Sequence, residues 1–200
     1  MPKVGMEPVR KKALVDAALR AIGHHGSLSV TMSEIAREAG VSAALAHHYF
    51  GSKEHLLTET IRALLRQLKV DTVGALRAAK TPRQRLSAII RVSFDADQFA
   101  PETVAAWLAF YVDAQRSEET RRLLVIYARR LDSNLLSALR ALVGADDASR
   151  IAEGAAAMID GLYIRQSLRS APISTSASVA LVEDYIEGQL AAAKAGNARE

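Results

Sequence analysis

The chain has 200 residues, of which 50% are hydrophobic and 24% are charged, and it contains no cysteine. This balance is that of a globular protein and excludes a wholly disordered chain. The lack of cysteine excludes disulfides, zinc–cysteine sites and thiol nucleophiles. Asp16 and Arg20 interrupt the apolar residues near the N-terminus. We therefore expect neither a signal peptide nor a membrane span, and we expect a cytoplasmic protein.

Charge and aromatic residues are unevenly distributed along the chain. Residues 1–53 hold seven lysines and arginines against four acidic residues, so they carry +3 of the net charge of +4. All five histidines lie in the first 55 residues, and seven of the ten aromatic residues lie between Phe94 and Tyr163. This distribution predicts a basic segment for an anionic partner and an aromatic segment for an apolar or cationic one.

Helical periodicity dominates the sequence, and no segment has a convincing strand pattern. The pair Thr31 and Glu34 has the spacing of a capping box, Gly40 can end the helix that follows, and Ser42 can begin the next. We expect Gly144 and Gly196 to separate later helices. The predicted helices cover about residues 8–23, 31–40, 42–50, 52–76, 82–95, 101–115, 118–143, 147–169 and 176–194.

The predicted fold is all-α, with two domains. Residues 1–52 form a tri-helical helix-turn-helix domain, and residues 53–200 form a larger helical domain for ligand binding and dimerisation. The long helix over 53–79 bridges the two.

The segment 31–53 is the strongest functional signal. It predicts a short helix, a glycine turn, and a second short helix that can enter the major groove of DNA. Positions Thr31 and Lys53 begin helices, where free backbone N–H groups favour phosphate. An ordinary corner between two helices would carry the same caps and turn. The candidates for the groove-facing surface are Ser42, Ala43, Ala44, His47 and His48.

The stretch IAREAGVSAALAHHYFGSKEHLL resembles the DNA-binding signature of the TetR family of bacterial repressors. The resemblance implies that Val41 and Ser42 open the recognition helix and that Lys53 contacts phosphate. It also places His47, His48 and Tyr49 at the DNA-facing end of that helix. Alanine at 44 and histidine at 47 depart from the usual pattern. The recognition helix has no arginine, so we expect phosphate contacts and packing into the groove to supply much of the affinity.

Two pairs of adjacent histidines, at 24–25 and 47–48, suggest a metal site as an alternative. Adjacent residues on a helix point about 100° apart, so neither pair has the i, i+4 spacing of metal ligands. Neutral hydrogen-bond donors beside phosphate are the simpler interpretation. We predict no metal and no cofactor.

A second cluster of chemistry lies in the aromatic segment. Trp107 and Tyr111 are one helical turn apart, and acidic residues such as Asp95 lie nearby in the sequence. Aromatic faces beside carboxylates can bind a cation. Packing of the same rings in an ordinary core is the alternative. The candidate ligand residues are Phe94, Asp95, Phe99, Trp107, Tyr111 and Tyr163.

The stretches SFDADQFAPETVAAWLAFYVDAQ, RRLDSNL and IDGLYIR resemble the choline-responsive TetR-type repressors of glycine-betaine synthesis. This resemblance implies a repressor of betaine-synthesis and choline-uptake genes that choline releases. Choline is a quaternary ammonium without an N–H donor, so aromatic faces and diffuse negative charge must recognise it. A TetR-type repressor of a different small cationic or apolar ligand is the alternative.

The last two predicted helices each carry an apolar stripe. Two such stripes paired across a twofold axis would form a four-helix interface in a homodimer, which suits a palindromic double-stranded operator. Packing within one chain is the alternative. The predicted interface residues are Ile151, Met158, Ile159, Leu162, Val182 and Ile186.

Two other function classes remain. An enzyme is disfavoured because no nucleophile, nucleotide or metalloprotease motif occurs and no cysteine is present, so we predict no catalytic residues. A helical adaptor with an incidental basic end would not bind duplex DNA in a salt-dependent manner.

Overall fold

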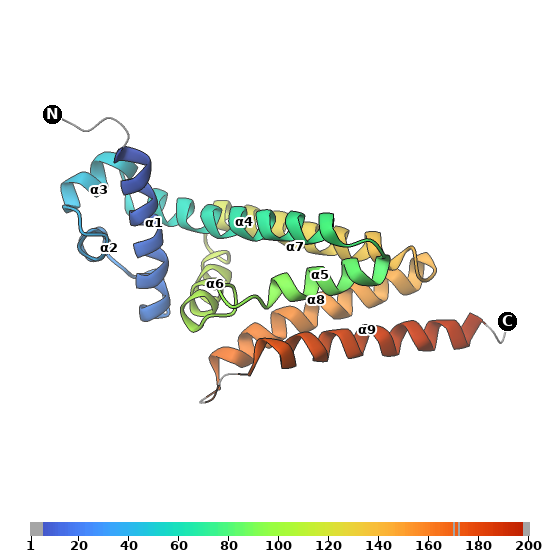
Figure 1. The fold of residues 1–200 in the computed structure, drawn as a ribbon. Coiled ribbons are helices and arrows are strands. Elements are labelled where there is room, and N and C mark those ends of the chain that lie inside the picture. Colours follow the sequence, from blue (N-terminus) through green and yellow to red (C-terminus); the bar gives the residue numbers. More distant parts are fainter. Residues whose placement is uncertain (1–5, 170, 172, 198–200) are drawn as a thin grey trace. The chain divides into compact units, whose positions relative to one another are not determined.

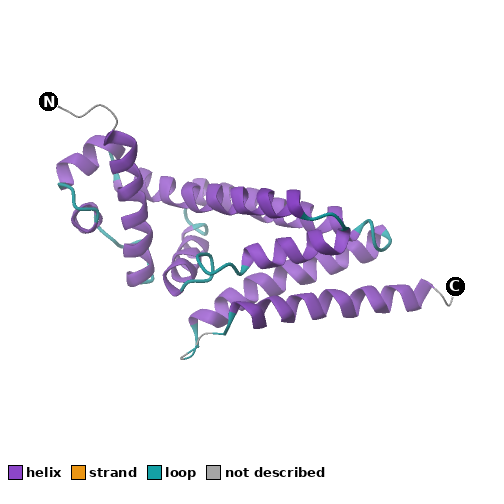
Figure 2. Cartoon of the chain, in the orientation of Figure 1, coloured by secondary structure: helices purple, strands orange, loops and turns teal. Residues whose placement is uncertain are grey.

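The computed structural model describes residues 6–169, 171 and 173–197, and every regular element among them is a helix (Figures 1 and 2). The helices are α1 (Met6–His25), α2 (Met32–Glu38), α3 (Ala43–Phe50), α4 (Lys53–Ala78), α5 (Pro82–Ser93), α6 (Pro101–Asp113), α7 (Glu118–Leu139), α8 (Ala145–Ser167) and α9 (Thr175–Asn197). The predicted all-α fold is confirmed. No helix of the described residues is long and apolar enough to span a membrane.

The predicted helix boundaries agree closely with the structure, with two differences. Helix α7 ends at Leu139 rather than near residue 143, because the chain turns through residues 140–143. Gly196 lies inside α9 instead of ending it. A capping box that the sequence interpretation missed opens α5. The Thr81 hydroxyl accepts from the Gln84 N–H, and the Gln84 side-chain oxygen accepts from the Thr81 N–H.

The chain divides into two compact units. The first comprises Met1–Arg66 and Pro101–Leu124, and the second comprises Gln67–Ala100 and Val125–Glu200. The division differs from a break after residue 52, because α6 joins the N-terminal helices and the boundary falls inside α4 and α7.

In the first unit, α1 packs against both α2 and α6. Its buried face consists of Leu14, Ala17, Ala18, Ala21 and Ile22. The contact with α6 is close enough to require a glycine. A Cβ atom on Gly23 would lie 2.6 Å from the carbonyl oxygen of Glu102, so any side chain there would meet backbone. The lack of a side chain at Gly23 therefore allows α1 and α6 to approach this closely.

In the second unit, α9 packs against both α8 and α5 (Figure 1). Its contact with α5 is polar: Arg83 pairs with Glu187, Ser87 donates to Glu183, and the Arg91 Nε lies 4.0 Å from the Glu183 Oε1. Apolar side chains of α9, including Val182 and Ile186, are buried. The helix is therefore held by a polar contact to α5 as well as by an apolar core.

Candidate functional site

The helix-turn-helix begins at the predicted capping box. The Thr31 hydroxyl accepts from the Glu34 N–H at 3.2 Å, and the Thr31 N–H donates to the Glu34 Oε2 at 2.7 Å. The same hydroxyl donates to that carboxylate at 2.9 Å. These bonds lower the pKa of Glu34. The carboxylate thus occupies the N-terminus of α2, where a phosphate was expected, and both donors of Thr31 are engaged.

Two left-handed glycines shape the turns on either side of α3. Gly40 has a φ of +68° and separates α2 from α3, and Gly51 has a φ of +72° and follows α3. Between them, the Ser42 hydroxyl caps α3 by accepting from the Leu45 N–H at 3.2 Å. The hydroxyl proton of Ser42 is not used by this bond, so it can still be donated to DNA.

The exposed face of α3 consists largely of predicted groove-facing residues. Ala44, His47 and His48 are exposed, and Ala43 is half-buried. The opposite face carries the buried Ala46 and Phe50. Both alanines are short, so the two histidines provide the longer polar side chains on this face.

Contacts from α1 hold the pair of short helices. The Arg20 Nε donates to the Glu38 Oε1 at 2.7 Å, which ties α1 to α2. The Lys11 ammonium lies 5.7 Å from the centroid of the Tyr49 ring, which ties α1 to α3. Tyr49 is half-buried. Its position favours a role in orienting α3, beside the DNA contact that the resemblance implies.

Lys53 begins α4 and is half-buried. Its ammonium donates to the Leu28 carbonyl oxygen at 3.3 Å. An ammonium has three N–H donors, so this bond leaves donors for a phosphate. Lys53 therefore has a structural contact that the sequence interpretation did not anticipate.

Three of the candidate ligand residues form one aromatic cluster in the second unit. The Phe94 and Tyr163 rings stack with centroids 6.1 Å apart, and the edge of Phe99 packs against them at 5.2 and 5.3 Å. The Tyr163 hydroxyl donates to the Ser93 carbonyl oxygen. Phe94 and Phe99 are buried, and Tyr163 is half-buried. Tyr163 is therefore the cluster's most accessible ring.

The remaining candidate ligand residues are placed differently. Asp95 is exposed, and its carboxylate accepts from the Asp97 N–H at 3.2 Å, as in an Asx turn. Trp107 and Tyr111 lie on α6 in the first unit, where Trp107 is buried and Tyr111 is 36% exposed. Although the two residues are one helical turn apart, Trp107 lies in the core and Tyr111 lies at the surface.

The predicted dimer residues are largely buried within one chain. Ile151, Ile159 and Val182 are fully buried, and Leu162 and Ile186 are nearly so, while Met158 is half-buried. A partner helix can reach only side chains that remain exposed. The large exposed apolar residues in this part of the chain are different ones: Ile164 of α8, Leu168 just after α8, and Leu181 of α9. Most of the two predicted stripes therefore packs within one chain, and Met158 is the member with the most exposed surface.

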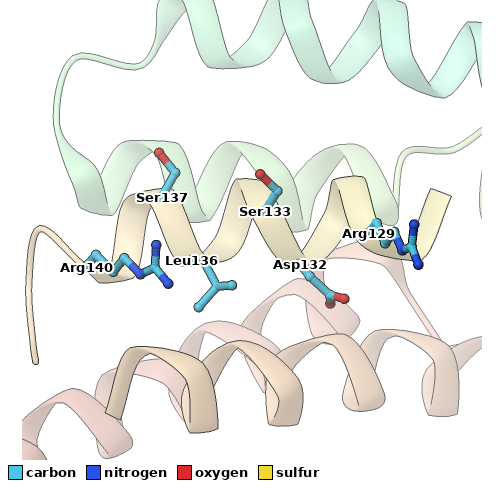
Figure 3. A pocket seen from close by; sticks show the side chains of 6 residues that line it. All are labelled: Arg129, Asp132, Ser133, Leu136, Ser137 and Arg140. Carbon is cyan, nitrogen blue, oxygen red and sulfur yellow. The ribbon is translucent and has the colours of Figure 1, made fainter. Parts of the chain in front are cut away.

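A shallow depression of about 520 Å³ lies along the C-terminal half of α7. Figure 3 shows Ser133 and Ser137 pointing to one side of the helix and Asp132 and Leu136 to the other. Arg129 and Arg140 complete the lining, which contains no aromatic residue. The depression therefore lacks the aromatic faces that a quaternary ammonium requires. Within the described residues, no group of three or more His, Asp or Glu side chains could hold a metal ion.

Comparisons with known proteins identify the family. Residues 14–60 match the family of bacterial regulatory proteins of the tetR type, and residues 82–191 match the C-terminal region of BetI-type transcriptional repressors. The chain is 78% identical over 192 residues to the HTH-type transcriptional regulator BetI of Rhizobium meliloti (strain 1021), covering 96% of this chain and 95% of that protein. It is 74% identical to the BetI regulator of Agrobacterium fabrum, covering 95% of this chain and 92% of that protein.

Solved structures agree with the fold. A transcriptional regulator from Pseudomonas aeruginosa PAO1 superposes with a TM-score of 0.78 at 29% identity, covering 92% of this chain and 91% of that one. A regulator from Saccharomonospora viridis, crystallised in complex with choline, superposes with a TM-score of 0.76 at 22% identity, covering 88% of this chain and 95% of that one. The chain therefore belongs to the TetR family of helix-turn-helix DNA-binding regulators and, within it, to the BetI-type transcriptional repressors.

Proposed function

We propose that this repressor binds a palindromic operator as a homodimer, controls genes of glycine-betaine synthesis and choline uptake, and is released by choline. The observation that carries the proposal is the combination, in a BetI-type chain, of an exposed recognition helix with an aromatic cluster in the second unit. Helix α4 is continuous across the boundary between the units, so a ligand-dependent tilt of α4 would reposition the recognition helices.

The proposed DNA surface combines the exposed face of α3 with the start of α4. It consists of Ser42, Ala43, Ala44, His47, His48, Tyr49 and Lys53. Thr31 is left out because Glu34 engages both of its donors. Lys53 contacts a phosphate and carries no sequence information in this proposal. Lys53→Met keeps most of the aliphatic stem, and it should flatten the salt dependence of operator binding by about one unit of slope.

The proposed effector residues are the Phe94, Phe99 and Tyr163 cluster, with Trp107 and Tyr111 tested separately. A trimethylammonium group offers no hydrogen-bond donor, and a desolvated contact with an aromatic face contributes about 2 kcal/mol. Tyr163 is the central candidate because its ring is partly accessible and its hydroxyl is anchored to Ser93. The choline complex of the Saccharomonospora viridis regulator, which has the same fold, supports a quaternary ammonium as the ligand class.

The proposed dimer uses exposed apolar residues of α8 and α9 rather than the buried stripes. Leu168, which follows α8, is 80% exposed and Leu181 of α9 is 46% exposed, so both side chains are accessible to a partner. A twofold axis through these helices would cover such side chains with the same surface of a partner. Each half of a palindrome would then meet one recognition helix.

The deciding experiment is calorimetric titration of the purified protein with choline and with its neutral isostere 3,3-dimethylbutanol. Choline should bind and the isostere should bind poorly. Tyr163→Leu should weaken choline binding at least tenfold, whereas Tyr163→Phe, which keeps the ring, should change it less than about threefold. The same comparison with Trp107→Leu and Trp107→Phe tests the α6 candidate.

Each outcome of the titration has a clear meaning. Equal binding of choline and the isostere would overturn cation recognition and favour a TetR-type repressor of an apolar ligand. Footprinting on the DNA upstream of the chain's own gene, with and without choline, tests release. A footprint that choline does not change would contradict choline as the effector.

A further inference from the structure

His47 is held by a hydrogen bond that determines which of its nitrogens carries the proton. The Nδ1 atom lies 3.1 Å from the carbonyl oxygen of Gly51. A carbonyl oxygen only accepts hydrogen bonds, so Nδ1 must be the donor. A neutral imidazole carries a single N–H, and the Nε2 atom of neutral His47 is therefore an acceptor.

Glycine at position 51 makes this bond possible. The Gly51 N–H donates to the His47 carbonyl oxygen at 2.7 Å, and the Ser52 N–H donates to the Phe50 carbonyl oxygen at 2.8 Å. These bonds form a tight turn centred on Gly51, whose φ of +72° is strained for any other residue. The direction of the Gly51 carbonyl, and with it the tautomer of His47, depends on that backbone conformation.

An acceptor at Nε2 restricts what His47 can bind. His47 is on the exposed face of α3, together with the short Ala44. A phosphate oxygen is itself an acceptor, so it cannot bond directly to an unprotonated Nε2. On base edges in the major groove, the hydrogen-bond donors are the N6 amine of adenine and the N4 amine of cytosine.

We propose that His47 is a specificity-determining residue that accepts a hydrogen bond from the exocyclic amine of an adenine or a cytosine. The Gly51 carbonyl is the positioning group that keeps Nε2 as the acceptor. The proposal rests on α3 being the helix that reads DNA, and it replaces the expectation that His47 is a neutral donor beside phosphate.

The tautomer can be measured without DNA. Nitrogen-15 spectra of the histidine-labelled full-length protein at pH 8.5, where histidine side chains are ordinarily neutral, distinguish the two ring nitrogens. His47→Ala assigns the signal. We expect protonated Nδ1 in the original protein and a shift toward protonated Nε2 in Gly51→Ala. Protonated Nε2 in the original protein would overturn the proposal.

The base contact is tested by selecting preferred duplexes from a random pool at the same pH. The original protein should prefer one base pair at one symmetric pair of positions, and His47→Ala should lose that preference alone. The adenine or cytosine of that base pair carries the candidate amine. His24→Ala, which removes an exposed histidine at the end of α1, is the matched control and should keep it.

Atomic substitution in the selected duplex then identifies the amine. Replacing that adenine by purine, or that cytosine by 2-pyrimidinone, should weaken binding about tenfold for the original protein and barely at all for His47→Ala. Unchanged binding when that amine is removed, or equal weakening of selected and random duplexes by His47→Ala, would overturn the assignment of His47. If the original protein showed no sequence preference in the random pool, the proposed role of α3 in reading DNA would be wrong as well.

Discussion

The N-terminal helices and the α8–α9 pair both bury an apolar stripe in a core. They differ in whether the residues predicted to contact a partner lie outside that stripe or within it. In α3, the buried Ala46 and Phe50 face the core, and the predicted contact residues His47 and His48 remain exposed. In α8, the predicted contact residue Ile159 is itself in the core. Helical periodicity therefore predicts that a side chain is buried, but it does not predict whether the same chain or a partner chain buries it.

The largest expected effect separates core from interface in α8 and α9. Ile159→Asp places a charge at a fully buried position and should lower the free energy of unfolding by about 4 kcal/mol or more. Leu181→Asp changes an exposed side chain and should leave the chain folded while weakening the dimer and operator binding. Denaturant unfolding and sedimentation velocity measure the two effects. If Ile159→Asp remained folded and dimeric, Ile159 would not be an essential core residue. If Leu181→Asp and Ile164→Asp both left the dimer unchanged, the interface would lie elsewhere.

A smaller effect compares two glycines at helix contacts, one in each unit. The added methyl of Gly23→Ala would meet the backbone of Glu102, which cannot move without shifting α6, so we expect a loss of about 2 kcal/mol. The added methyl of Gly154→Ala would meet the end of the Tyr185 side chain, which can rotate away. Alanine also favours helix over glycine by about 1 kcal/mol, so this second loss should be under about 1 kcal/mol. Thermal unfolding of both variants measures the difference, and a more stable Gly23→Ala would show that α6 yields.

The smallest effects have opposite dependence on pH in the two units. Backbone and hydroxyl bonds from Thr31 lower the pKa of Glu34, so its contribution to stability is present at neutral pH and is lost as the pH falls through the lowered pKa. Burial, followed by the charge of Glu153, raises the pKa of Asp132. Asp132 therefore favours the folded state at low pH and loses that contribution as the pH rises through the raised pKa.

Two substitutions test these signs by melting temperature as a function of pH. Glu34→Gln keeps an acceptor for the capping box but should make the loss of stability below about pH 4 less steep. Asp132→Asn should raise the melting temperature at pH 7 and change it less at pH 4. A steeper acid loss in Glu34→Gln, or a lower melting temperature for Asp132→Asn at pH 7, would contradict the assignment.

Features that depend on neighbours in the sequence could be predicted well. The capping box at Thr31, the cap at Ser42 and the turn at Gly40 each depend on the backbone within a few residues, and the structure contains all three. The exposure of His47 and His48 follows from the same helix boundaries. The pattern of Thr81 and Gln84 was equally readable and was overlooked.

Features that depend on distant segments could not be predicted. The hydrogen bond between the Tyr163 hydroxyl and the Ser93 carbonyl oxygen joins residues 70 positions apart, and no sequence periodicity predicts such a contact. The bond from His47 to Gly51 is local, but it depends on the direction of one carbonyl group in a strained turn. Burial of Ile159 by its own chain likewise follows from three-dimensional packing.

The polar contact between α5 and α9 has a consequence for how α9 finds its place. The apolar stripe of α9 places buried aliphatic side chains about one turn apart, at Val182, Ile186 and Leu190, so hydrophobicity alone distinguishes poorly between positions one turn apart. The charged contacts are not interchangeable in this way, because Arg83 faces Glu187 while Ser87 and Arg91 face Glu183. A slip by one turn would leave at least one of these partly exposed charges without its counterpart, at a cost of about 1 kcal/mol or less for each pair. The two ion pairs and the hydrogen bond therefore add a modest preference for the observed axial position of α9 to the one set by core packing.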